Sequence, residues 1–375
     1  MRQTKRWILI ICRFIFGLTF LFSGLVKAVD PLGTTYKISD YLDAFSLGFF
    51  SDLSLVSAFL LIILEFTIGF NLVFGIQVKK TAWIAAAFML VMTPLTLYLA
   101  IANPVSDCGC FGDALVITNW QTFYKNLILD ALLVLILVFA SEDRPIFSNW
   151  ASYIIMLIPV LSCLGLELYC YNHLPIIDFR PYKVGNNLPS LMVIPDDAPS
   201  DEYNISFIYE KDGVQKEFNL ENYPAEDSTW TFVSQNSVLI KRGYVPPIHD
   251  FSVQTEDGDI TDLILENEGY TFLLISSKLE KADLSRQKDI NALYDYINSK
   301  NISFYCLTSS FNDDVEAFKT TNNVKYPIGA TDEITLKTII RSNPGLVLLK
   351  AGNVVAKWHY NDLPTKNELK RIIKK

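Results

Sequence analysis

Long apolar runs alternate with short polar segments through the first half of this 375-residue chain. An α-helix needs about 20 mainly apolar residues to cross the hydrocarbon core of a bilayer. Five segments meet this requirement, at 7–29, 53–76, 83–102, 123–140 and 150–170. The pattern therefore predicts five membrane-spanning helices. The third is expected to kink at Thr93-Pro94, because proline removes a backbone hydrogen-bond donor.

Basic residues predict the orientation of these spans. Arg2, Lys5 and Arg6 precede the first span, and Lys79 and Lys80 lie between the second and the third. Lys and Arg are enriched in cytoplasmic loops, so both segments are expected inside the cell. The first run is too long for a cleaved signal peptide and is expected to remain as a span. An odd number of spans then places the C-terminal half outside the inner membrane of a bacterium, in the periplasm.

The pattern changes to short alternating segments after the last apolar run. Residues 1–172 form the predicted membrane domain, and 173–245 are expected to form a small β-rich module with strands from Leu188 onward. Tyr203–Tyr209 and Gln215–Phe218 are predicted strands joined through Asp212-Gly213, a dipeptide suited to tight hairpins. Beyond Pro246-Pro247, at 246–375, strands alternate with helices, which is typical of an α/β sheet.

The order of elements in this last region is specific. The predicted strands are Phe251–Thr255, Ile260–Leu263, Thr271–Ser276, Ile302–Thr308, Leu346–Lys350 and Val354–Trp358. The predicted helices are Ala282–Lys300, Asp313–Asn322, Ile334–Ile340 and one that closes the chain. This order resembles the thioredoxin-like superfamily, particularly its membrane-tethered, periplasmic TlpA-like branch. The most specific piece is Asn343-Pro344-Gly345, where such folds place a cis-proline before the last hairpin.

One departure from that family bears on function. A redox-active thioredoxin carries Cys-x-x-Cys after the strand that here ends at Ser276, whereas this chain has Ser276-Ser277-Lys278-Leu279. Without a thiolate there is no nucleophile for disulfide exchange. Cys306 lies inside an apolar strand and is interpreted as a core residue. We therefore expect a thioredoxin-like domain whose role is binding or structural support and which has no redox activity of its own.

Composition and charge indicate which classes of molecule this protein is expected to bind. Half of the residues are hydrophobic, 19% are charged, and the mean hydropathy is +0.25, so lipid is an expected partner. The formal net charge of −8 provides no basic face of the kind that nucleic-acid binding requires. Nucleic acid is therefore not expected as a partner.

Two of the six cysteines form a motif. Cys108 and Cys110 lie in the run Asp107-Cys108-Gly109-Cys110-Phe111-Gly112-Asp113, on the loop after the third span, which is predicted to face outward. Their spacing brings the two Cα atoms near the separation that a disulfide accepts, about 4.4–6.8 Å. A small ring of this kind is strained and therefore more oxidising, which favours electron exchange. A structural clip, or a thiolate site for a soft metal such as Cu(I), remains an alternative. No metal ligand is assigned, because the histidines lie far from the motif in sequence.

This run resembles the Cys-Gly-Cys-Phe-Gly motif of the MauE branch of the DoxX-like family. Ser23-Gly24-Leu25-Val26-Lys27 resembles the ending of that family's first helix, and Glu65 with Gly69 resembles its second helix. The resemblance covers residues 6 to about 140, a four-helix core, and leaves the fifth span as a tether. It implies a membrane component of periplasmic thiol-disulfide chemistry that assists disulfide formation.

Two charged residues within the spans are further candidates. An ionised Glu65 near the middle of the second span costs at least ~2.5 kcal/mol, so it needs a partner or a proton. It either relays protons or makes a structural hydrogen bond between helices. Lys27 is the nearest cation in the motif, and a position near the outer surface also lets it snorkel to water.

Two functions remain open at this point. In the first, Cys108 and Cys110 cycle between dithiol and disulfide and take electrons from a periplasmic protein client. The cofactor that receives those electrons is unknown, and a quinone enters only by analogy with four-helix membrane thiol oxidases. In the second, the protein is a non-enzymatic membrane scaffold whose cysteine pair clips a loop. The sequence leaves the client and the electron acceptor unnamed.

Overall fold

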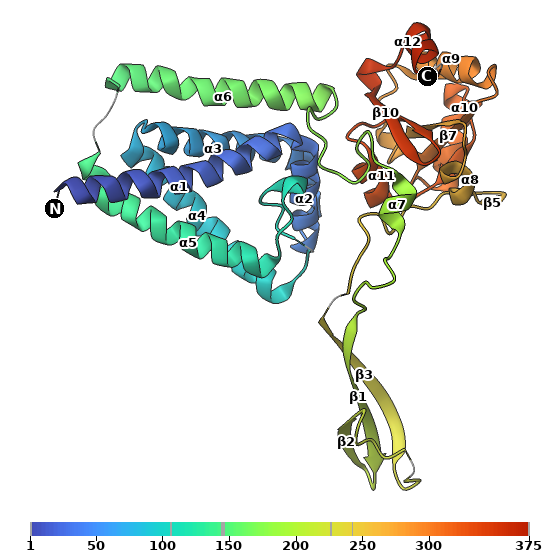
Figure 1. Cartoon of the computed structure of the whole chain (residues 1–375), viewed down its shortest axis with the longest axis horizontal. Coiled ribbons are helices and arrows are strands. Elements are labelled where there is room, and N and C mark those ends of the chain that lie inside the picture. The colour runs from blue at the N-terminus through green and yellow to red at the C-terminus, as the bar shows by residue number, and fades with distance from the viewer. Residues whose placement is uncertain (1, 106, 144–146, 226, 242, 374–375) are drawn as a thin grey trace. The chain divides into compact units, whose positions relative to one another are not determined.

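The computed structural model describes residues 2–105, 107–143, 147–225, 227–241 and 243–373. Two compact units are present (Figure 1). One comprises Met1–Asn186 together with Ser252–Lys375, and the other comprises Asn187–Phe251. The first unit contains both the membrane helices and the thioredoxin-like fold.

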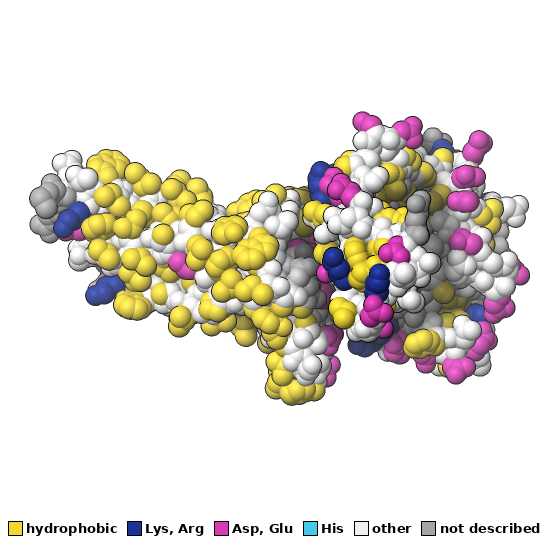
Figure 2. Space-filling view, turned by 90° about the horizontal axis from the view of Figure 1, so that it is seen from below, with side chains coloured by type: hydrophobic (Ala, Val, Ile, Leu, Met, Phe, Trp, Pro, Cys, Tyr) yellow, Lys and Arg dark blue, Asp and Glu magenta, His cyan; other side chains and the backbone are white. Residues whose placement is uncertain are grey.

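Five helices in the first unit are long and apolar enough to cross a membrane. They are α1 (Arg2–Val29), α3 (Ser54–Phe74), α4 (Val78–Ala102), α5 (Asn119–Phe139) and α6 (Asn149–Asn172). The prediction of five long apolar helices is confirmed, and the chain is a multi-pass membrane protein. Helix α4 continues through Pro94 as a single helix. Figure 2 shows hydrophobic side chains covering the helical part, whereas charged side chains gather over the rest of the visible face.

Helices α1 and α3 pack with their backbones close together. A Cβ atom added to Gly69 would lie 2.3 Å from the backbone nitrogen of Leu21, and one added to Gly24 would lie 2.6 Å from that of Phe66. Small residues at such crossings let membrane helices approach closely. The buried core between α1, α3, α4 and α5 includes Phe16 and Leu72. The arrangement matches the predicted four-helix core.

The sixth helix contributes to a separate cluster, in which Cys163 packs with Ala28 and Ile62. Short elements complete the connections between the spans. They are α2 (Pro31–Ala44), η1 (Gly48–Leu53), η2 (Gly112–Ala114) and η3 (Ala140–Glu142).

Helix α2 lies between the first two predicted spans, in a segment for which the sequence predicted no helix. Asp30 caps it by accepting a hydrogen bond from Gly33 N at 3.0 Å, and Pro31 occupies its first turn, as is common at helix starts. This helix was missed because its polar sequence has only a weak apolar stripe.

The second unit is a three-stranded antiparallel sheet of order β2-β1-β3. Its elements are α7 (Leu188–Met192), β1 (Glu202–Lys211), β2 (Val214–Asn219) and β3 (Thr231–Lys241). The predicted hairpin turn at Asp212-Gly213 is confirmed, and both residues have positive φ. The expectation of strands from Leu188 is wrong, because Asn187 accepts a hydrogen bond from Ser190 N and starts a short helix there.

The C-terminal part of the first unit is a seven-stranded sheet of order β10-β9-β6-β7-β8-β4-β5. Its strands are β4 (Gln254–Thr255), β5 (Gly258–Asp259), β6 (Tyr270–Ile275), β7 (Ser303–Thr308), β8 (Ile328–Ala330), β9 (Gly345–Lys350) and β10 (Asn353–His359). The helices are α8 (Thr261–Leu265), η4 (Leu279–Lys281), α9 (Gln287–Asn298), α10 (Asn312–Asn322), α11 (Glu333–Ile339), η5 (Tyr360–Asp362) and α12 (Lys366–Ile373).

The pairing of these strands is that of a thioredoxin-like fold, as predicted. Strand β6 is parallel to β7 and antiparallel to β9, which pairs with β10 as a hairpin. The Asn343–Pro344 peptide bond directly before β9 is cis, at the predicted position. The thioredoxin-like fold is therefore present without a Cys-x-x-Cys motif.

Two predicted elements of this domain are wrong. The strand expected at 260–263 is wrong, because Thr261–Leu265 is helical. Asp259 Oδ1 accepts a hydrogen bond from Thr261 N at 2.8 Å, a local turn that competes with an extended strand. The helix expected over 282–300 begins only at Gln287. Asp283 accepts a hydrogen bond from Ser285 N, a local turn that competes with a helix start.

Candidate functional site

The loop between α4 and α5 holds the cysteine motif in a tight turn. Gly109 has a φ of +66° and Gly112 a φ of +51°, in the left-handed region that favours glycine. Asp107 Oδ1 accepts a hydrogen bond from Gly109 N at 2.8 Å, and Gly112 N donates to Gly109 O at 3.1 Å. A Cβ at residue 109 would lie 3.1 Å from Lys37 Cγ. Both glycines are therefore needed for the conformation of the loop.

This turn brings the two cysteine sulfurs into contact. Cys108 Sγ and Cys110 Sγ lie 2.8 Å apart as free thiols. Their side chains are only 6% and 8% exposed, and they pack against Leu99 and Tyr41. A disulfide requires an S–S distance of about 2.05 Å, so a small shift of the sulfurs would join them.

The two thiols differ in acidity. The hydrogen bond from Cys108 lowers the pKa of Cys110 to about 6; burial opposes this shift, and the ammonium groups of Lys125 and Lys27 add to it. The same hydrogen bond, together with burial, raises the pKa of Cys108 well above its usual value. Cys110 is therefore the thiolate of the pair near neutral pH.

A buried polar cluster connects the loop to the membrane helices. Lys27 Nζ on α1 lies 2.8 and 2.9 Å from the two carboxylate oxygens of Glu65 on α3, and both residues are about 5% exposed. Ser23 Oγ lies 2.8 Å from Glu65 Oε2 and 2.6 Å from Cys110 O. Lys27 is thus buried and paired with Glu65, so the snorkelling interpretation is wrong. The structure brings together all four residues that the sequence predicted as site candidates.

The cluster borders a small internal space. A cavity of about 30 Å³ lies between Ser23, Glu65, Cys110 and Lys125, among other residues of α1, α3, α4 and α5. This volume accommodates about one or two water molecules. Lys125 lies over the ring of Phe111, with Nζ 4.6 Å from the ring centroid.

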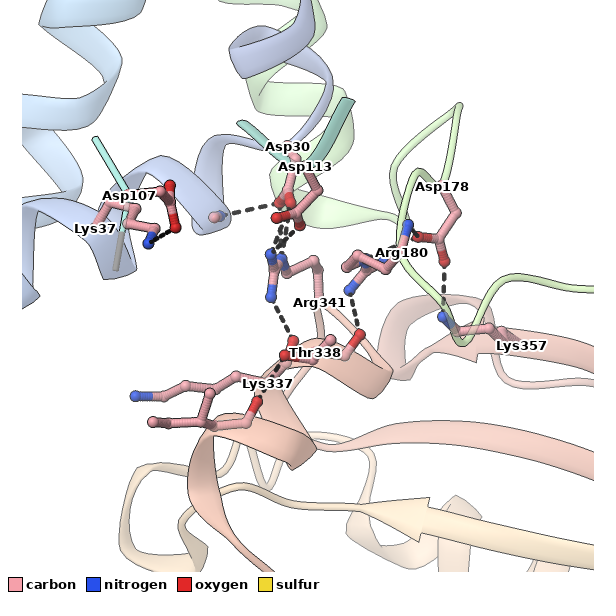
Figure 3. A network of polar contacts seen from close by, with 12 residues as sticks. Asp30, Lys37, Asp107, Asp113, Asp178, Arg180, Lys337, Thr338, Arg341 and Lys357 are labelled. Carbon is pink, nitrogen blue, oxygen red and sulfur yellow. Dashed lines mark hydrogen bonds and ion pairs between the residues drawn. The ribbon is translucent and has the colours of Figure 1, made fainter. Parts of the chain in front are cut away.

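A second polar network joins the loop to α2 and to Arg341 (Figure 3). Arg341, just after α11, is 7% exposed and contacts Asp30 at 2.9 Å and Asp113 at 3.1 Å. Lys37 pairs with Asp107 at 2.8 Å. A cavity of about 230 Å³ lies beside this network, with Gly109 and Gly112 in its lining.

Several contacts of the site do not follow from the sequence motifs. Ser23 belongs to the run that resembles the end of the family's first helix, and its spacing of four residues from Lys27 places both on one helix face. Tyr41 donates a hydrogen bond to Cys108 O at 2.6 Å, and Arg341 reaches the loop from more than 200 residues away. No local sequence pattern indicates these last two contacts, since they depend on the tertiary fold.

The other predicted positions lie apart from the site. Cys306 is fully buried in the core of the thioredoxin-like sheet, where burial raises the pKa of its thiol to about 12. Ser276, at the end of the strand that carries Cys-x-x-Cys in redox-active thioredoxins, contacts Asn343 Oδ1 through its hydroxyl at 2.8 Å. Among the described residues, no cluster of His, Cys, Asp and Glu side chains suited to holding a metal ion is found.

Comparisons with known proteins match separate parts of the chain. Residues 203–242 match a domain of unknown function, DUF8463. A similar solved structure is the solution structure of a putative protein disulfide isomerase from Bacteroides thetaiotaomicron, at 15% identity and a TM-score of 0.26, covering 33% of this chain and 82% of that one. The chain has no match among the curated proteins. Residues 5–140 match the family described as methylamine utilisation protein MauE. This range contains α2 to α5, nearly all of α1, and the cysteine loop, which together form a MauE-family membrane domain.

Proposed function

We propose that this membrane protein exchanges electrons between the Cys108–Cys110 pair and the thiols of a protein client in the periplasm. The contact of the two sulfurs at 2.8 Å, within a loop fixed by two glycines of positive φ, is the observation that carries the proposal. The acidic thiol of Cys110 and the membership of this loop in a MauE-family domain support it.

The chemistry begins with the oxidised pair. A client thiolate attacks Cys108 Sγ, the Cys108–Cys110 bond breaks, and Cys110 leaves as a thiolate. Cys110 is the better leaving group because its pKa is the lower of the two. A second client thiolate then attacks the client sulfur of the mixed disulfide and releases Cys108. The client gains a disulfide and loses two protons, while the pair gains two electrons and, near neutral pH, the one proton that Cys108 carries.

The cluster beneath the pair is suited to handling those protons. The Ser23 hydroxyl has one proton but faces two oxygens, Glu65 Oε2 and Cys110 O. Both hydrogen bonds are complete only when Glu65 Oε2 carries a proton and donates it to Ser23. Lys27 pairs with the same carboxylate. Glu65 acts as the proton relay in this proposal while also linking α1 to α3.

Turnover requires an acceptor for the two electrons. A quinone remains the candidate by analogy with other membrane thiol oxidases. The space of about 30 Å³ beside Cys110 is too small for a quinone ring. An acceptor of this class would therefore approach Cys110 only after α1, α4 or the loop moves.

Single-cysteine variants test the proposal through the mixed disulfide. We expect Cys108 of Cys110→Ser to attack the disulfide of an oxidised client, the reverse of the proposed reaction, which releases one client thiolate and leaves a mixed disulfide. Because no second loop thiol can release it, this complex should accumulate as a high-mass band that disappears on reduction. The matched control is Cys306→Ser, which leaves the loop pair intact and should accumulate none. If Cys110→Ser and Cys108→Ser both form no such complex and both support growth that depends on the protein, the pair does not exchange, and a scaffold with a structural clip replaces the redox function.

A further inference from the structure

Arg341 belongs to the thioredoxin-like domain, and its side chain binds two carboxylates of the membrane domain (Figure 3). Its Nε lies 2.9 Å from both oxygens of Asp30, and its Nη2 lies 3.1 Å from Asp113 Oδ2. Its Nη1 donates to the carbonyl of Lys337 on α11, and its guanidinium lies 5.3 Å from the ring centroid of Tyr36. The side chain is 7% exposed, so its charge depends on these partners.

The two carboxylates occupy defined positions around the cysteine motif. Asp113 is the last residue of the motif run and lies in η2, three residues after Cys110. Asp30 caps α2, and α2 contacts the start of the motif through Lys37, which pairs with Asp107. One guanidinium therefore fixes the end of the cysteine loop to the helix that also holds its beginning.

The thiols of Cys108 and Cys110 are buried in this structure, in which Arg341 is paired with Asp30 and Asp113. The cavity of about 230 Å³ beside the guanidinium is lined by Gly109 and Gly112, and neither cysteine contributes to that lining. Cys110 instead borders the inner cavity next to Glu65. The two cysteine residues are only 6% and 8% exposed and present almost no surface to a protein client.

We propose that Arg341 is a positioning residue through which the thioredoxin-like domain docks on its own membrane domain and keeps the cysteine loop closed. Its release from Asp113 opens the loop and exposes the two sulfurs. The segment between α11 and β9 thus binds the membrane domain of the same chain in the closed state. The functional role of this closure rests on the proposed exchange with a client. The closure itself is a property of the loop and can be measured without turnover.

The rate of thiol labelling measures this closure. Full-length protein in liposomes is reduced, treated with a bulky hydrophilic maleimide, and digested, and the peptides carrying Cys108 and Cys110 are quantified over time. We expect Arg341→Gln to raise their labelling rate by about tenfold or more, because local opening no longer breaks an ion pair. Arg341→Lys keeps one charge without the planar fork and should give a smaller increase.

Two controls separate positioning from general stability. Arg286→Gln removes an exposed arginine of the same domain that pairs only with Asp289 among the described residues, and it should label at the wild-type rate. Cys306 in the core of the domain reports folding, because it should stay unlabelled in every folded variant. If Arg341→Gln exposes Cys306 and therefore does not fold, Asp113→Asn replaces it, since that change leaves the Arg341–Asp30 pair intact.

The outcomes are distinct from those of the redox test. Faster labelling of Cys108 and Cys110 with a protected Cys306 supports the positioning role, whether or not the pair turns over in cells. Wild-type labelling rates in the folded Arg341→Gln and Asp113→Asn variants would overturn it, even if mixed disulfides with a client are found.

Discussion

Cys108 and Cys110 are separated by one glycine, yet their thiols are placed in different electrostatic surroundings. Cys110 receives a hydrogen bond from Cys108 and faces Lys125 and Lys27, whose charges favour its thiolate. Cys108 donates that hydrogen bond and is held in its thiol form. The pair therefore has one nucleophile and one partner thiol, which is the division of roles that disulfide exchange requires.

The acidity of Cys110 predicts a pH dependence of alkylation. Because only the thiolate reacts and the pKa lies at about 6, the rate of its reaction with a small reagent such as iodoacetamide should be half-maximal near pH 6. Below that pH the rate should fall about tenfold per unit, and above pH 7 it should be nearly constant. In Cys108→Ala the donor is lost, and the midpoint should move upward. A midpoint near the pKa of an ordinary thiol in both proteins would contradict these assignments.

Residues of the site differ in how far sequence predicts them. Cys108 and Cys110 follow from a local motif, and Glu65 follows from its cost inside an apolar helix. The pairing of Lys27 with Glu65 was one of two options, because sequence does not show whether a side chain near a helix end turns inward. Ser23 is recognisable only once its helix face is known, and Arg341 only once the thioredoxin-like fold is in place.

Among the elements, the contact of α1 with α3 carries the site, since Ser23 and Lys27 lie on one helix and Glu65 on the other. Their close approach depends on small residues. A Cβ at Gly69 would lie 2.3 Å from the backbone nitrogen of Leu21, which cannot move aside as a flexible side chain would. The helices would have to separate to accommodate it.

Gly69→Ala should therefore destabilise the membrane domain by about 1–3 kcal/mol, the usual cost of overpacking a tight interface. Gly165→Ala is a matched control on α6, because a Cβ at that position would contact nothing within 4 Å. Thermal unfolding in detergent should show a lowered midpoint for the first variant and an unchanged one for the second. Equal midpoints for both variants would show that the close packing of α1 and α3 does not limit stability.

At the same scale, the long apolar helices were predictable and the short polar ones were not. All five spans follow from hydropathy, because lipid leaves a helix no alternative partner for its backbone. Helix α2 depends instead on a single side-chain cap at Asp30, and α8 follows a local turn in which Asp259 Oδ1 accepts a hydrogen bond from Thr261 N. Such local hydrogen bonds outweigh a weak apolar pattern, so α8 forms where a strand was predicted.

At the scale of the whole molecule, the proposed function depends on which side of the membrane the cysteine loop faces. Five spans with a basic N-terminus predict that the loop and the C-terminal domain face the periplasm. A reporter enzyme active only in the periplasm should therefore work when fused after Lys375 and fail when fused at Lys79. The reverse pattern would place the cysteine pair in the reducing cytoplasm and remove its thiol clients.

The thioredoxin-like domain also acquires a role that its sequence alone does not indicate. It lacks the Cys-x-x-Cys motif, and Cys306 is enclosed in its core. Its edge near Pro344 instead contacts the cysteine loop through Arg341. The domain thus has a thioredoxin-like fold without the motif, while the cysteine pair proposed to be reactive belongs to the membrane domain.

The redox state of Cys108 and Cys110 in living cells tests the central claim most directly. Cells are quenched in acid, free thiols are modified with a maleimide that adds measurable mass, and the oxidised fraction of the loop peptide is determined. A pair that turns over should be partly reduced during growth and should become more reduced when the supply of client thiols rises. A pair that is fully oxidised under both conditions would contradict the redox function and identify the disulfide as a structural clip.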